Sequence, residues 1–173
     1  QASTTFAEEA KRKSVVQYFD GGLRNRQTVT KDNTSGTAVV AETLYDQQGR
    51  PMIQVLPAPT LSKLIAYNPL FNVADINSRE YDKGIYDTLT SLADYCADGA
   101  PAMNTVSGTA LYYSASNPQK NLAFNQYIPE SNGYVFTETR YAQDNTGRIN
   151  MQSGVGATHQ IGSGRETKYY YGT

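Results

Sequence analysis

Apolar and polar residues alternate with a period of two along much of the first 60 residues of the chain. The alternation is clearest in residues 26–30, while residues 15–19, 37–45 and 52–56 are strand-like in their β-branched, aromatic and other apolar residues, and Asp, Asn and Gly residues separate the four segments. Side chains at period two point to opposite faces of a sheet, and β-branched and aromatic residues are enriched in strands. The pattern predicts a meander of antiparallel strands, the last of them ended by Pro57, which lacks an amide donor.

Two further elements are expected outside this meander. Thr5 and Glu8 have the spacing of a capping box, which predicts a short helix over residues 6–13. Residues 122–128 and 134–141 are rich in apolar and aromatic side chains and flank a Pro-Glu-Ser-Asn-Gly turn. They predict a β-hairpin.

Between these regions, residues 61–116 lose the alternation, and within them only residues 85–95 could form a short helix. We interpret the stretch as a long, loop-rich insertion, because loops of this length are usually functional or lie over another surface. The sequence therefore predicts a mostly β fold in three parts. Residues 1–60 are a β segment, 61–116 the insertion, and 117–173 a β-hairpin segment expected to continue beyond an aromatic strand.

The amino-acid composition indicates what the core is made of and argues against several classes of function. The chain has 14 Tyr, 5 Phe and no Trp, so much of its core is expected to consist of rings with a polar tip, which suit sheets. Its 15 basic and 16 acidic residues nearly cancel, which argues against binding to nucleic acid or to an anionic membrane. No apolar run approaches the roughly 20 residues of a membrane-spanning helix. Cys96 is the only cysteine, which excludes an internal disulfide.

Candidate chemistry is sparse. His159 is the only histidine, and a triad with Ser153 or Ser163 would need a convergence in space that the sequence does not indicate. Acidic turns can bind calcium, but single carboxylates at separate turns favour turn capping. Exposed tyrosine clusters could stack on sugars, although packing between strands is the favoured interpretation. We predict no catalytic, cofactor-binding or metal-binding residues and no enzymatic activity.

A short motif recurs three times. The clearest copy runs from Tyr45 to Arg50, and looser copies start at Tyr18 and Tyr141. In this motif the tyrosine ring ends a strand, the aspartate accepts turn amides, the glycine adopts positive φ, and the arginine begins the next strand. The predicted motif residues are Tyr18, Asp20, Gly21, Tyr45, Asp46, Gly49, Arg50, Tyr141, Asp144, Gly147 and Arg148. The first copy departs from the Gly-Arg order at Gly22-Leu23-Arg24.

The string Tyr-Asp-x-x-Gly-Arg resembles the YD repeat of Rhs proteins. Longer strings within residues 16–21, 49–57, 144–148 and 159–172 are similar to Rhs-type proteins of Bacteroidetes. The resemblance implies a fragment of a β-strand shell on an exported protein, at the cell surface or outside the cell, which often encloses a C-terminal toxin or effector domain. It implies no catalytic residues in this region.

The expected function is therefore structural: a shell segment that packs against neighbouring repeats of its own polypeptide and encloses or displays an effector. A surface-exposed adhesin module that binds glycan or protein is the main alternative. A substrate or accessory piece of a bacterial secretion machine is another, with secretion proteins as partners. Buried tyrosines would favour the shell, and a row of solvent-facing rings would favour binding.

Overall fold

The computed structural model describes residues 13–33, 36–74, 79–85 and 98–172. Within them the chain is mostly antiparallel β, and its helical turns are short. The strands are β1 (Lys13–Phe19), β2 (Asn25–Asp32), β3 (Thr37–Tyr45), β4 (Pro51–Val55), β5 (Ala58–Pro59), β6 (Phe136–Tyr141), β7 (Ile149–Gln152) and β8 (Thr167–Lys168). The helices are α2 (Gly108–Tyr112) and the 3-10 turns η1 (Asn125–Tyr127) and η2 (Ala157–His159). In the described part, no helix is long and apolar enough to cross a membrane.

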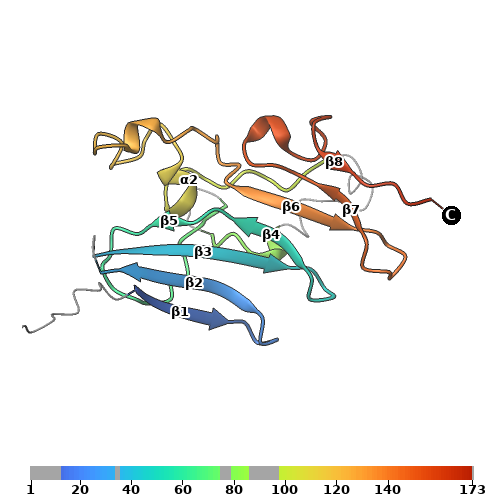
Figure 1. Ribbon diagram of the computed structural model, residues 1–173, viewed down its shortest axis with the longest axis horizontal. Coiled ribbons are helices and arrows are strands. Elements are labelled where there is room, and N and C mark those ends of the chain that lie inside the picture. The colour runs from blue at the N-terminus through green and yellow to red at the C-terminus, as the bar shows by residue number, and fades with distance from the viewer. Residues whose placement is uncertain (1–12, 34–35, 75–78, 86–97, 173) are drawn as a thin grey trace, which may run out of the picture.

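The strands form one sheet in the order β1-β2-β3-β4-β6-β7-β8, with every named pair antiparallel (Figure 1). The short strand β5 pairs with β3 beyond the end of β4. The predicted meander is confirmed, and β3 covers the predicted residues 37–45. β4 ends at Val55, two residues before Pro57, as the missing amide donor requires.

One face of the sheet is buried by the chain between β5 and β6. Ile53, Phe136 and Val55 from the sheet form a cluster with residues of this covering segment. Tyr81, Met103 and Ala110 are the covering residues, each at most 2% exposed. The described residues of 61–116 are mostly irregular, and they supply the second layer of the core.

The opposite face of the sheet carries mostly uncharged side chains, which strand register places in rows across the sheet. The uncharged rows are Val15-Thr30-Val39, Gln17-Thr28-Ala41, Thr43-Gln54-Thr137 and Thr139-Gln152-Thr167. One further row, Lys13-Asp32-Thr37, carries two opposite charges at the end of the sheet. We call this surface the open face. The covered face differs in holding the buried ionic residues Glu42, Glu138 and Arg140.

The predicted hairpin of residues 122–128 with 134–141 is wrong. Residues 122–128 form turns and the 3-10 turn η1, while β6 pairs with β4 on one side and β7 on the other. The apolar residues there do not face a core: Leu122, Phe124 and Tyr127 are 58%, 81% and 76% exposed. A composition typical of strands was overridden by the long-range pairing of β4 with β6.

Other expectations fall partly outside the described residues. The helix predicted over 6–13 lies outside them except for Lys13, which begins β1. The helix predicted over 85–95 lies outside them after Ile85. At the other end, β8 stops at Lys168, so the aromatic residues 169–171 follow the strand and do not extend it.

Candidate functional site

The connection between β3 and β4 is built around Asp46. One carboxylate oxygen, Oδ1, accepts hydrogen bonds from the amides of Gln48 and Arg50, both at 2.9 Å. The other, Oδ2, accepts from Arg50 Nε at 2.7 Å and lies 2.6 Å from Nη2. Gly49 has φ +80°. The predicted roles of the aspartate, glycine and arginine are all visible in this corner, by which we mean the turn and the residues flanking it.

The connection between β1 and β2 repeats this geometry. Asp20 Oδ1 accepts from the amides of Gly22 and Arg24 at 2.8 and 3.0 Å, and Oδ2 accepts from Arg24 Nε at 2.8 Å. The residue with positive φ before the arginine is Leu23, at +57°. Leu23 is therefore the counterpart of Gly49, whereas the predicted Gly21 has no positive φ. The departure from the Gly-Arg order leaves the backbone conformation unchanged.

The first copy also differs in its ring. Each corner has a register shift just before its first residue, and the shifts fall at Tyr18/Phe19, Leu44/Tyr45 and Arg140/Tyr141. Phe19, not Tyr18, is thus the counterpart of Tyr45 and Tyr141. Tyr18 packs against the core cluster of Val29, Ala38 and Val40, and its ring lies 5.5 Å from that of Tyr67. The prediction was displaced by one residue because the tyrosine and the phenylalanine are adjacent.

The third corner, between β6 and β7, is wider. The amide of Ala142 donates to the carbonyl of Arg148, as Asp46 does to Arg50 in the second corner. Asp144 Oδ1 accepts from the amide and the hydroxyl of Thr146, at 3.0 and 2.6 Å. Gly147 has φ +73° directly before the arginine. The backbone bond that closes the corner is therefore kept. Asp144, however, bonds to Thr146 within the loop, whereas Asp46 bonds to the corner arginine.

The arginines of the first two corners each lie over the ring that begins the next corner, and the arginine of the third lies over Tyr171, which follows β8. Arg24 is 5.1 Å from the Tyr45 ring centroid, Arg50 is 4.2 Å from that of Tyr141, and Arg148 is 5.1 Å from that of Tyr171. These are cation–π distances. Figure 1 shows the three corners at one end of the sheet, on the same side.

The tyrosine hydroxyls complete the contact. Each one donates to the carbonyl of the residue that follows the corner arginine. The three bonds are Tyr45 to Asn25 at 3.0 Å, Tyr141 to Pro51 at 2.9 Å and Tyr171 to Ile149 at 2.9 Å. We call the three arginine–tyrosine contacts with these bonds the corner ladder. It joins the start of β2 to the end of β3, the start of β4 to the end of β6, and the start of β7 to the segment that follows β8.

Two corner carboxyls are held in their charged form. Hydrogen bonds from the backbone and side chain of Arg24 lower the pKa of Asp20, and hydrogen bonds from Thr146 lower the pKa of Asp144. Both groups therefore favour the folded state at neutral pH, and the benefit is lost as pH falls through their folded pKa values.

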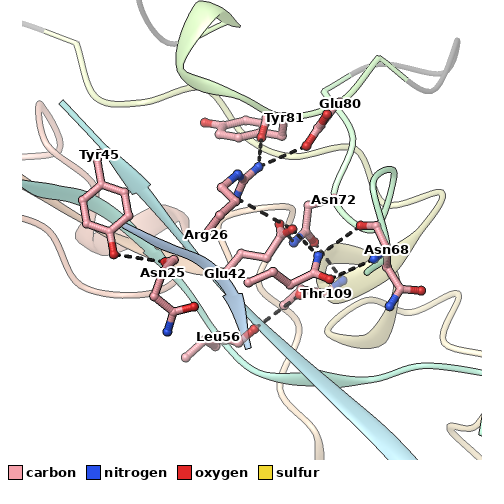
Figure 2. A network of polar contacts seen from close by, with 11 residues as sticks. Asn25, Arg26, Glu42, Tyr45, Leu56, Asn68, Asn72, Glu80, Tyr81 and Thr109 are labelled. Atoms are coloured by element: carbon pink, nitrogen blue, oxygen red, sulfur yellow. Dashed lines mark hydrogen bonds and ion pairs between the residues drawn. The ribbon is translucent and has the colours of Figure 1, made fainter. Parts of the chain in front are cut away.

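A buried polar network fixes the covering segment to the sheet (Figure 2). Glu42 Oε1 accepts from Gln27 Nε2 at 2.7 Å, and Glu42 Oε2 accepts from Asn72 Nδ2 at 2.6 Å. Gln27 also exchanges hydrogen bonds with the backbone of Asn68, and Asn72 accepts from the amide of Thr109. Asn68 and Asn72 of the covering segment are thus bonded to the adjacent strands β2 and β3, and Asn72 links them to Thr109 in α2.

The negative charge of Glu42 is only partly balanced, because one cation, Arg26, lies near both Glu42 and Glu80. Arg26 lies 3.7 Å from Glu42 and 3.3 Å from Glu80. Burial nevertheless raises the pKa of Glu42, opposed by the charge of Arg26 and by the bonds from Asn72 and Gln27. The desolvated carboxyl therefore favours its neutral form more than an exposed glutamate does.

A second buried pair lies on β6. Arg140 donates from Nε to Glu138 Oε1 at 2.7 Å, and both side chains are at most 1% exposed. Glu138 Oε2 accepts from the amide of Ala100 at 2.7 Å, and Arg140 donates to the carbonyl of Asp98. The pair anchors residues 98–100 on the sheet. Its removal would leave buried charges without partners.

The residues considered for catalysis do not converge. His159 is exposed in η2, whereas Ser153 is buried and its Oγ accepts from the amide of Glu138. Ser163 Oγ accepts from the amide of Arg165 in an exposed turn. Cys96 lies outside the described residues. Among the residues that are described, no group of three His, Cys, Asp or Glu side chains could hold a metal ion.

A surface pocket of about 500 Å³ lies beside α2. Its walls come from residues 59–62, 68–71 and 106–119 of the covering segment, and none of the lining residues is charged. Phe71 and Tyr112 contribute rings, while Leu61 and Leu70 are 79% and 51% exposed. The volume falls in the range of small-molecule sites, so the pocket can accommodate an uncharged ligand.

Sequence reasoning identified the corner residues except in the first copy, where Phe19 and Leu23 take the places predicted for Tyr18 and Gly21, and it missed the ladder between corners and the buried ionic groups. The ladder partner of Arg50 is Tyr141, 91 positions away, and no local spacing indicates such a pair. Glu42 and Glu138 carried a usable signal. Each occupies an inward position of an alternating strand, where a carboxylate needs buried partners.

Comparison with known proteins gives one match. A family model described as a domain of unknown function, DUF6443, matches residues 1–95, which is more than half of the 173 residues. No curated protein and no solved structure matches the chain.

Proposed function

Because the chain belongs to the DUF6443 family, whose function is unknown, we propose a role for it from its geometry. It acts as a structural β segment that packs against neighbouring strands of a larger assembly. The observation that carries the proposal is the corner ladder, which joins successive strand pairs by the same arginine–tyrosine contact three times. A unit that repeats along a sheet is a structural device, because every copy stabilises the next.

The finer proposal is that the chain is part of the repeat shell of an exported Rhs or YD-repeat protein. The corner between β3 and β4 supports it, since Asp46, Gly49 and Arg50 each perform the role expected of that repeat. The chain would then have the rest of its own polypeptide as its partner. It would enclose or display an effector domain at the cell surface or outside the cell.

The largely uncharged open face supports the same proposal. Solvent-facing strand positions often carry charged residues, whereas all rows of this face except Lys13-Asp32-Thr37 consist of Thr, Gln, Val and Ala. Such a surface suits contact with another layer of protein more than contact with bulk water. The buried charged groups Glu42, Glu138 and Arg140 hold the covering segment on the other face, which fits a structural role.

A second candidate is a binding module for a neutral glycan or protein segment. The pocket beside α2 favours it, because its lining is uncharged and includes exposed apolar side chains. The exposure of the tyrosine rings does not favour one role over the other. Tyr127 and Tyr170 are 76% and 87% exposed, as a binding surface would require, whereas Tyr81 is 1% exposed, as in a packed shell. If binding is the function, Leu111→Trp, which fills the pocket, should abolish it and leave the corners intact.

Hydrogen exchange tests the structural role. We would compare the recombinant chain with the protein isolated from its natural source, following the amides of β1, β8 and the central strand β3. The proposal expects the two edge strands to exchange more slowly in the natural protein, because neighbouring strands cover them, and β3 to be protected in both. Edge strands that exchange equally fast in both samples would refute it.

A further inference from the structure

The outer edge of β1 is apolar and, among the described residues, no strand pairs with it. Val15, Val16 and Phe19 are 53%, 37% and 55% exposed. Proteins usually blunt such an edge with charges, prolines or bulges, because its free amides and carbonyls recruit other strands. Within β1 only Lys13, at its start, is charged.

The covering segment adds apolar surface beside this edge. Ile65 packs with Tyr18 against the core cluster, and the Tyr67 ring lies 5.5 Å from the Tyr18 ring. Tyr67 is still 38% exposed, and Leu64, next to Ile65, is 72% exposed. A strand added to β1 would find apolar side chains on the covered side as well as at Val15 and Phe19.

The ladder identifies what such a strand carries. The rings that begin the second and third corners, Tyr45 and Tyr141, each lie under an arginine from the preceding corner. Tyr171 lies under Arg148 in the same way. Phe19 is the first ring of this series among the described residues, and a strand added along the outer edge of β1 would supply its arginine.

We infer that the outer edge of β1 is a docking site for an antiparallel strand preceded by an arginine, whose guanidinium stacks on Phe19. The inference rests on the proposed structural function, and it names the partner as another strand of the corner type. Main-chain bonds supply affinity in this mode of recognition, and the arginine supplies register.

Phenylalanine makes this site weaker than the internal ladder contacts. Its ring accepts a cation, but it has no hydroxyl to donate to the carbonyl after the arginine, as Tyr45 and Tyr141 do. The site is therefore a partial ladder contact. Phe19→Tyr should complete it and tighten binding.

The probe is a blocked peptide with the sequence of residues 46–56, which contains Arg50 and the strand β4. Binding to the full chain is followed by the exchange of β1 amides and by titration. We expect slower β1 exchange, at least fivefold weaker binding with Phe19→Ala or with the Arg50→Gln peptide, and tighter binding with Phe19→Tyr. Leu122→Ala, at an exposed site away from the edge, serves as the matched control and should bind as the parent does.

Three results would overturn the site: no protection of the β1 amides that point away from β2 at millimolar peptide, equal binding of the Arg50→Gln peptide, or protection of those outward amides before peptide is added. The last result would mean that the chain covers its own edge. The coupling between Arg50 and Tyr141 inside the chain is measured separately. If the peptide does not bind but Arg50 and Tyr141 are energetically coupled, only the docking site is overturned. If the peptide does not bind and Arg50 and Tyr141 are not coupled, the proposed structural function is overturned as well.

Discussion

Leu23 and Gly49 occupy the same position in successive corners, and both have positive φ. An L-residue pays for this conformation with a clash that glycine avoids, about 1–2 kcal/mol. Leu23 is 85% exposed, so its side chain gives little packing in return. Leu23→Gly should therefore raise the free energy of unfolding by about 0.5–1 kcal/mol, after the entropic cost of glycine is subtracted.

Denaturant unfolding measures this change. Leu64→Gly is the matched control, since Leu64 is 72% exposed and is not among the residues with positive φ. That variant should be neutral or destabilised. Equal effects at the two leucines would remove the claim that the corner imposes a left-handed residue before each arginine.

The glycine itself gives the converse prediction. Gly49→Ala should lower the free energy of unfolding by about 1–2 kcal/mol, because alanine must adopt φ +80° there. Gly21→Ala is the control, since Gly21 has no positive φ and a Cβ there would meet nothing within 4 Å. The melting temperature of Gly49→Ala should be lower than that of Gly21→Ala. The opposite order would contradict the assignment of Gly49 as the turn glycine.

At the scale of elements, the buried network of Glu42 makes stability depend on pH. Burial raises the pKa of this carboxyl, so the folded state binds its proton more tightly than the unfolded state does. The contribution is complete below the ordinary value of 4.5 and is lost as pH rises through the folded pKa. Stability from this group therefore falls with rising pH.

Glu42→Gln tests the sign. The free energy of unfolding of the parent minus that of the variant should decrease as pH rises from about 4, because glutamine does not titrate. Denaturant unfolding at a series of pH values between 4 and 8 supplies both curves. If the difference in unfolding free energy stays constant or grows with pH, burial does not raise the pKa of Glu42.

The same elements show where sequence reasoning succeeds. The strands β1 to β4 were predictable because each is rich in β-branched, aromatic or other apolar residues and is bounded by turn residues, and β3 matches the prediction to the residue. The hairpin at residues 122–141 failed because composition describes local preference, whereas β6 pairs with a strand 80 residues earlier. The loop-rich stretch 61–116 gave no pattern, since irregular segments bury side chains without a period.

For the candidate site the limit is similar. Asp46, Gly49 and Arg50 act within one turn, so their spacing reveals their roles. The first copy was misaligned because Tyr18 and Phe19 are adjacent and only the register shift between them identifies the corner ring. The contact of Arg50 with Tyr141 depends on how strands are ordered in the sheet, which a motif does not encode.

At the scale of the whole molecule, β1 and β8 leave two sheet edges open within the described chain. We expect the isolated protein to self-associate through the apolar edge of β1 as its concentration rises. Val15→Lys should shift it toward monomer in sedimentation velocity, while Val106→Lys, at a side chain of similar exposure, should not. Association that persists with Val15→Lys would place the contact elsewhere.

The central claim is that the corner ladder couples successive strand pairs into one structure. The most direct measurement is a double-mutant cycle on Arg50→Gln and Tyr141→Leu, from denaturant unfolding of the four proteins. The 4.2 Å contact predicts a coupling of about 0.5–1.5 kcal/mol. The control cycle of Arg165→Gln with Tyr141→Leu should give none. Additive effects of Arg50 and Tyr141 would contradict the account.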